Sequence, residues 1–318
     1  MNSRFLLGLL ALFSISSVAL AGGQKPGSLL VFPKYDNGAG SMTVLTVTNT
    51  HSSQSVRAHF LYINGESCTE NNAVELLTPR DTVTLITAAH SPDTGRGYAY
   101  VYARGTTQAA PITFNHLAGT SIVFDALTQS VYTVPAVVFN GMTAEGSTTD
   151  LDSDGVRDMD GLEYSQAPDQ TVIPRFFGQA GVGNISSELV LVNLTGGRAF
   201  TTSTRFLVFN DNEEAFSGEH TFYCWDSAPL ISVSGATSHD FLRNSTNNDP
   251  GEVIGLPALE AGWILFDGGT ANSTVVSISD PAVLVTLIEH GGVASAQLPF
   301  VVGEQDNGGL LPTSIFGN

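Results

Sequence analysis

The sequence predicts an all-β protein with two tandem, internally duplicated antiparallel β-sandwich domains joined by an acidic linker. Three observations lead to this expectation. The composition suits short strands and turns, a series of segments occurs twice in the same order, and a dense run of carboxylates separates the two series.

The composition is typical of a packed globular chain. Charged residues make up 13% of the sequence and hydrophobic residues 42%, which argues against a disordered protein. Val and Thr are frequent and favour strands, while the many Gly, Ser and Asn residues favour the turns between them. The length allows one large domain or two of ordinary size.

The first element is an N-terminal signal peptide over residues 1–21. Arg4 precedes a short apolar run, Phe5 to Phe13, and Ala19 to Ala21 form a small-x-small cleavage site. The run is shorter than the roughly 20 residues that span a bilayer, and no later segment is long and apolar enough to do so. We therefore expect a secreted or cell-surface protein, extracellular or periplasmic, with no integral membrane segment after cleavage.

The net charge of −18 excludes two classes of partner. Binding to nucleic acid or to anionic lipid requires clusters of Lys and Arg, and the sequence has none.

The two domains are predicted from an internal repeat. A duplication keeps matched segments in order, with spacing that drifts as loops are inserted, whereas chance matches would scatter. The matched pairs are Ser28–Asn37 with Thr171–Gln179, Thr43–Thr50 with Ser187–Leu194, His59–Asn64 with Arg205–Asn210, and Gly97–Thr107 with Gly262–Ala271. The predicted domains are residues 22–140 and 171–318, with a linker over residues 141–170.

Each copy is expected to be an antiparallel sandwich of about seven or eight strands. Thr43–Thr48 alternates Thr with Val or Leu, the period of a half-buried strand. Tyr98, Tyr100 and Tyr102 should share one face of their strand. Pro33 and Pro174 are expected to end the first strand of each copy, where a missing N–H does least harm.

The linker contains DLDSDGVRDMDGLEY, a run of carboxylates with one positive charge. Carboxylates about 5 Å apart repel by roughly 0.8 kcal/mol per pair in water, and a bound divalent cation would reverse that sign. Calcium takes six to eight oxygen ligands, which alternating Asp residues followed by a turn-forming Gly can supply. The predicted Ca²⁺ ligands are Asp150, Asp152, Asp154, the carbonyl of Val156, Asp158, and Asp160 or Glu163.

The pattern D-x-D-x-D-G-x-x-D in this run resembles the calcium loops of thrombospondin type 3 repeats, dockerins and EF-hands. The resemblance implies that Asp150, Asp152, Asp154 and the Val156 carbonyl ligate calcium. Gly161 stands where an EF-hand has a bidentate Glu, so we expect a structural site in a calcium-loop linker and not a sensor. The remainder of the chain resembles, in general pattern only, uncharacterised secreted bacterial β-sandwich proteins.

The chain has two cysteines, Cys68 and Cys224, at matching places in the two copies. A disulfide between them is one interpretation, because disulfides form in exported proteins. The other is that each is a small buried apolar side chain.

No catalytic motif is present, so no catalytic residue is predicted. The histidines have no H-E-x-x-H spacing, and there is no G-x-S-x-G or Walker sequence. We expect a non-catalytic structural, adhesive or assembly protein whose partners are other surface proteins or glycans. The alternative is a carbohydrate-binding module or glycan-active hydrolase, which an exposed aromatic row such as Tyr98, Tyr100 and Tyr102 would favour. The sequence leaves the ligand and the oligomeric state open.

Overall fold

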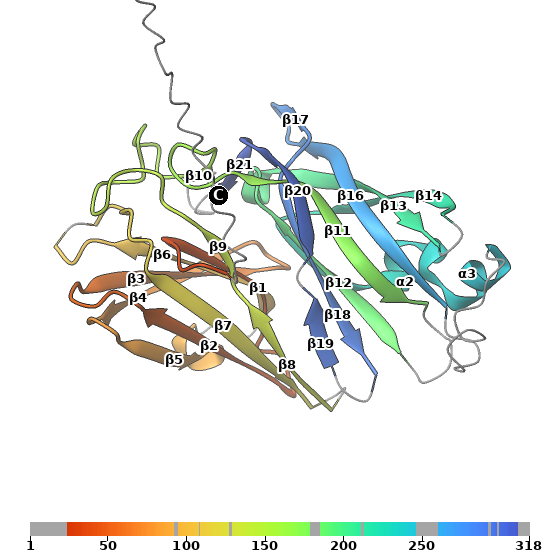
Figure 1. Ribbon diagram of the computed structural model, residues 1–318, viewed down its shortest axis with the longest axis horizontal. Coiled ribbons are helices and arrows are strands. Elements are labelled where there is room, and N and C mark those ends of the chain that lie inside the picture. Colours follow the sequence, from red (N-terminus) through yellow and green to blue (C-terminus); the bar gives the residue numbers. More distant parts are fainter. Residues whose placement is uncertain are drawn as a thin grey trace, which may run out of the picture.

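The computed structural model describes residues 24–91, 95–107, 109–126, 129–178, 185–210, 213–245, 260–291, 294–297 and 299–310. The predicted signal peptide lies outside these ranges. The described part of the chain is 60% strand and 8% helix, which confirms the all-β prediction. The strands form two halves that lie side by side (Figure 1).

The N-terminal half contains two sheets. The first sheet has the strand order β5-β2-β7-β8, and the second has the order β4-β3-β6-β1-β9. The elements are β1 (Leu29–Asp36), β2 (Ser41–Asn49), β3 (Val56–Asn64), β4 (Glu70–Leu77), β5 (Thr82–Ile86), α1 (Thr87–His90), β6 (Arg96–Arg104), β7 (Leu117–Asp125), β8 (Ser130–Pro135) and β9 (Val137–Phe139).

The C-terminal half repeats this arrangement. The third sheet has the order β15-β12-β18-β19, and the fourth has the order β14-β13-β16-β11-β20, with β17 paired to β16. The elements are β11 (Ala167–Phe177), β12 (Ser186–Asn193), η1 (Gly197–Ala199), β13 (Thr201–Phe209), β14 (Ala215–Phe222), β15 (Trp225–Pro229), α2 (Leu230–Val233), η2 (Gly235–Thr237), α3 (His239–Ser245), β16 (Ala261–Asn272), β17 (Ser277–Ser279), β18 (Val283–His290), β19 (Ala294–Gln297) and β20 (Phe300–Gln305).

The two halves share one topology, as a duplication requires. Each strand of the first and second sheets has a counterpart at the same place in the third and fourth sheets, and all the pairings are antiparallel. A short extra pair, β10 (Arg157–Met159) with β21 (Gly308–Leu310), joins the segment between the halves to the end of the described chain.

A central core between the halves corrects the prediction of two separate sandwich domains. Each half has its own core, but a further cluster takes side chains from all four sheets, including Val134 of β8, Tyr100 of β6, Val190 of β12 and Ala167 of β11. The four sheets therefore pack together in a propeller-like arrangement and not as two independent sandwiches. The alternating strand pattern could not reveal the contact between the halves, because the second and third sheets are buried on both faces.

Pro33 and Pro174 do not end their strands, contrary to the prediction. β1 and β11 both continue past the proline, and the pairing register shifts between Phe32 and Tyr35 and between Ile173 and Phe176. A bulge leaves one residue out of the ladder, so the missing N–H of proline costs no hydrogen bond there.

A second feature is repeated in the two halves: opposite each bulge, a glycine allows two neighbouring strands to approach closely. Gly97 pairs with Tyr35, and Gly262 pairs with Phe176. A Cβ atom on Gly97 would lie 1.9 Å from the Ile63 carbonyl oxygen, and one on Gly262 would lie 2.5 Å from that of Phe209. Only glycine permits this close approach of neighbouring strands.

A disulfide joins the two halves. Cys68 lies after β3 and Cys224 before β15, and both are buried in the central core. The structure thus pairs the two cysteines that the sequence placed at matching positions.

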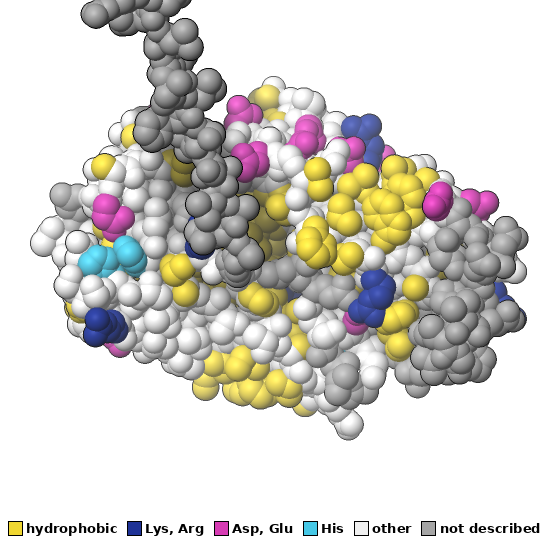
Figure 2. Space-filling model, viewed as in Figure 1, with side chains coloured by type: hydrophobic (Ala, Val, Ile, Leu, Met, Phe, Trp, Pro, Cys, Tyr) yellow, Lys and Arg dark blue, Asp and Glu magenta, His cyan; other side chains and the backbone are white. Residues whose placement is uncertain are grey.

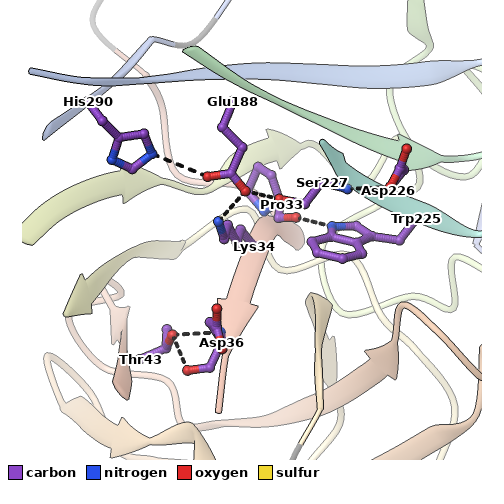
Figure 3. Close-up of polar contacts among 9 residues, drawn as sticks. All are labelled: Pro33, Lys34, Asp36, Thr43, Glu188, Trp225, Asp226, Ser227 and His290. Carbon is purple, nitrogen blue, oxygen red and sulfur yellow. Dashed lines mark hydrogen bonds and ion pairs between the residues drawn. The ribbon is translucent and has the colours of Figure 1, made fainter. Parts of the chain in front are cut away.

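Polar contacts across the same interface are drawn in Figure 3. Lys34 of β1 donates to Glu188 of β12 at 2.5 Å, and Glu188 also accepts from Ser227 and lies 3.3 Å from His290. The indole N–H of Trp225 donates to the Pro33 carbonyl at 2.8 Å. These contacts fix the third sheet against the second.

Within the described ranges, no helix combines the length and the apolar character needed to cross a membrane.

Candidate metal centre

The acidic segment folds into a tight coil built from its own Asp side chains. Asp152 Oδ1 accepts from the Asp154 N–H at 3.2 Å, and Asp154 Oδ1 accepts from the Val156 N–H at 2.7 Å. Ser153 and Gly155 have φ angles of 64° and 80°. The left-handed backbone at Gly155 explains the predicted need for glycine at this turn.

Five of the predicted ligands converge in space. Oxygen atoms of Asp150, Asp152 and Glu163 lie within 4.8 Å of one another, as do those of Asp152, Asp154 and Asp158. Ligands on opposite sides of a calcium ion are about 5 Å apart, since Ca–O distances are about 2.3 to 2.6 Å. Asp152 belongs to both groups and therefore lies at the centre of the cluster.

Glu163 closes the cluster. Its side chain is buried, Oε1 accepts from the Leu151 N–H at 2.5 Å, and Oε2 accepts from the Asp158 N–H at 3.3 Å. Burial raises the pKa of Glu163 to about 7, although these two backbone hydrogen bonds act in the opposite direction. The carboxylate is thus held between the two ends of the coil.

The charges in the cluster are poorly compensated by the protein. Burial raises the pKa of Asp158 to about 6, and the charges of Asp154 and Asp160 act in the same direction. Asp150 Oδ1 is buried and has no hydrogen-bond partner among the described residues. A divalent cation would supply both the missing charge and the missing contact.

Asp160 plays a different part from the other acids. Its Oδ1 accepts from the Leu162 and Glu163 N–H groups at 2.8 and 3.0 Å, and it belongs to neither convergent group. Of the two residues that could supply the closing oxygens, the structure therefore brings Glu163 to the cluster and uses Asp160 to form the turn before it. The Val156 carbonyl stays a predicted ligand.

The acidic segment is packed against both halves. Met159 and Tyr164 are fully buried in the central core, and Thr149 donates to the Tyr164 hydroxyl at 2.9 Å. The guanidinium of Arg157 lies 4.9 Å from the centre of the Tyr102 ring. An ion bound by these carboxylates would therefore be coupled to the interface between the halves.

The tyrosine row of β6 is not a carbohydrate platform. Tyr98, Tyr100 and Tyr102 do share one face, as predicted, but they are only 3%, 0% and 6% exposed in the central core. This part of the alternative function has no surface on which a sugar could stack.

A second acidic site, which the sequence did not indicate, lies on the fourth sheet. A cleft of about 790 Å³ is lined by Arg205, Glu219, Asp267 and Asp280 among others. Burial raises the pKa of Asp280, and the charges of Asp169 and Asp267 act in the same direction. Three of these residues come from separate strands, and Asp280 follows β17, so no sequence spacing could have grouped them.

Comparison of the chain with protein-family models, with curated proteins and with solved structures gave no match.

Proposed function

We propose that this chain is an exported, non-catalytic structural or assembly protein of the cell surface or extracellular space, stabilised by a calcium ion in the acidic segment. The main support for the proposal is the convergence of five carboxylates on a coil that packs against both halves. They are those of Asp150, Asp152, Asp154, Asp158 and Glu163. All of the proposed side-chain ligands are carboxylates, the hard oxygen donors that calcium prefers.

Two further features support the proposal. The N-terminal sequence has the layout of a signal peptide, and the Cys68–Cys224 disulfide suits an oxidising, extracytoplasmic compartment. The coil packs on the central core through Met159 and Tyr164, so an ion bound there would stabilise the contact between the halves. Even a weak site, with a Kd of about 10⁻⁴ to 10⁻³ M, would be filled in a calcium-rich exterior.

The test is thermal unfolding and limited proteolysis of the mature chain in calcium and in chelator. With a Kd of 0.1 mM taken as an example, 10 mM calcium should stabilise the protein by about 2.7 kcal/mol. Asp152→Asn should lose most of this gain, and Glu145→Gln, an exposed acid of the same segment outside both groups, should keep it. Equal melting and equal cleavage in calcium and chelator would refute the metal site.

The runner-up is a carbohydrate-binding or glycan-hydrolysing protein. The cleft on the fourth sheet favours it, because its carboxylates lie on the same sheet as the stacked rings of Phe209 and Trp263, whose centroids are 4.0 Å apart. Aromatic faces and carboxylates are the groups that such sites use. A glycan array and assays of glycan hydrolysis test this alternative, and Trp263→Ala should abolish any binding found.

A further inference from the structure

Equivalent faces of the second and fourth sheets differ in what covers them. Tyr98 and Tyr100 of β6 are 3% and 0% exposed. Their counterparts on β16, Trp263 and Leu265, are partly exposed, and Phe300 on the neighbouring β20 is 67% exposed. The face of the second sheet that is buried in the central core therefore corresponds to a solvent-facing side of the fourth sheet.

The pairing registers establish this equivalence. Tyr98 lies opposite Ile63, and Trp263 lies opposite Phe209. In the same way, Tyr100 lies opposite Val31 of β1, and Leu265 lies opposite Val172 of β11.

We call this surface the open face of the fourth sheet. Figure 2 shows hydrophobic side chains gathered over β20, β11 and β16. The open face consists of Val172, Leu207, Phe209, Trp263, Leu265 and Phe300.

The third sheet shows what kind of surface fits such a face. Val190 and Val192 of β12 point into the central core and cover the tyrosine row. By strand order, the counterpart of the third sheet in the N-terminal half is the first sheet. Thr46 and Thr48 of β2 stand where β12 has Val190 and Val192, and they are partly exposed.

The outward side of the first sheet is suited to burial. Among its four strands only Asp125, at the end of β7, is charged, although the protein carries a net charge of −18. The threonine hydroxyls pair with one another, Thr46 with Thr84 at 3.2 Å and Thr48 with Thr82 at 2.9 Å. Covering them with apolar side chains would leave these hydroxyl groups hydrogen-bonded.

We propose that the open face of the fourth sheet binds the outward side of the first sheet of a second copy of this chain. The contact repeats, between molecules, the contact that already exists between the two halves. It is heterologous, so copies add head to tail and form an open chain or a ring. The inference deepens the proposed assembly role and rests on it, but it does not depend on calcium.

The test is the mass of the mature chain in sedimentation velocity over a range of concentrations, with calcium and with chelator. The wild-type chain should form a concentration-dependent series of oligomers in both. Leu265→Arg blocks the open face and Thr46→Arg blocks the first sheet, so each variant alone should be monomeric. Because each variant keeps one intact surface, an equimolar mixture should stop at a dimer, about twice the monomer mass.

Two variants control for folding and for charge. Phe300→Arg changes a side chain that is already 67% exposed and should act like Leu265→Arg without perturbing the core. Val275→Arg adds the same charge at a residue that is 90% exposed and outside both surfaces, and it should associate like the wild type. All variants should melt at temperatures close to that of the wild type.

A wild-type chain that is monomeric at every concentration would overturn the proposal. So would dimers of Thr46→Arg alone, which would indicate a symmetric contact between two open faces, or a mixture that stays monomeric. A monomer that binds a glycan through Trp263 would assign the face to carbohydrate instead. Association in chelator without any effect of calcium on melting would support this inference and refute the calcium site. A chain that stays monomeric but melts at a higher temperature in calcium would refute this inference and support the calcium site.

Discussion

The carboxylate of Glu163 accepts a hydrogen bond from the backbone N–H of Leu151, 12 residues earlier in the chain. This bond, with a second from the Asp158 N–H, ties the end of the acidic coil to its beginning. The two bonds place the buried Glu163 carboxylate beside Asp150 and Asp152, where its oxygens could complete the coordination of a metal ion.

Glu163→Gln should remove most of the calcium-dependent rise in melting temperature. The amide keeps an oxygen acceptor for Leu151 but loses the charge and the bidentate binding that calcium uses. Asp160→Asn is the matched control, because Asp160 only accepts bonds from the following turn and an amide oxygen can do the same. A calcium response lost in Asp160→Asn and kept in Glu163→Gln would reverse the assigned roles.

Replacing both cysteines by serine should destabilise the protein by about 2 to 5 kcal/mol. The Cys68–Cys224 bond closes a loop of 156 residues across the interface between the halves, so its loss frees a long segment in the unfolded state. Denaturant unfolding of the double variant Cys68→Ser/Cys224→Ser measures the effect, and reduced wild-type protein should unfold in the same range. Equal stability of the oxidised and reduced wild type would contradict this prediction.

Stability should fall between about pH 4.5 and pH 2 partly because of Glu188. Burial alone would raise the pKa of Glu188, but the hydrogen bond from His290 and the charge of Lys34 lower it to about 2, below its ordinary value of 4.5. A lowered pKa in the folded state gives stability that is present above pH 4.5 and lost as the pH falls through the folded value. The full shift corresponds to about 3 kcal/mol.

Glu188→Gln should therefore unfold at lower temperature than the wild type at pH 7, with a gap that narrows toward pH 3. Lys34 is 7% exposed at its side chain, and removing its partner leaves a buried charge unpaired. The double variant Lys34→Met/Glu188→Gln should recover part of the loss, because it removes that charge. A gap that stays constant from pH 7 to pH 3 would contradict this account.

Gly97→Ala and Gly262→Ala should each destabilise the fold by about 1 to 3 kcal/mol or more. A methyl group at either position would overlap a carbonyl oxygen of the neighbouring strand, with the closer overlap at Gly97. Gly235→Ala is the control, since a Cβ there would have no atom within 4 Å. Wild-type stability in both strand variants would contradict the close approach of neighbouring strands at the two glycines.

The sequence was most informative where the signal was local or repeated. The alternation at Thr43–Thr48 became β2, whose burial pattern alternates as expected. The matched segments became equivalent strands with the same sheet order, and the two cysteines at matching positions, for which the sequence left a disulfide as one of two interpretations, form a disulfide. Each of these features depends on residue spacing, which a sequence displays directly.

The relation between the halves could not be predicted, because period two identifies two faces of a strand but not what covers each one. Tyr100 faces the central core and Leu265 faces outward, although they occupy equivalent positions. Lys34 and Glu188 are 154 residues apart, and nothing in their local sequence indicates that they pair. For the candidate site, the run of Asp residues was evident, but the choice of Glu163 over Asp160 depended on how the chain turns at Gly161.

The most direct test of the central claim is the number of calcium ions bound per chain, measured by equilibrium dialysis and elemental analysis of the mature protein. In dialysis buffer with about 10 mM calcium, we expect one bound ion per chain in the wild type and in Glu145→Gln, and none in Asp152→Asn. A wild-type chain that retains no calcium above the dialysis buffer, or an Asp152→Asn variant that retains as much as the wild type, would contradict it.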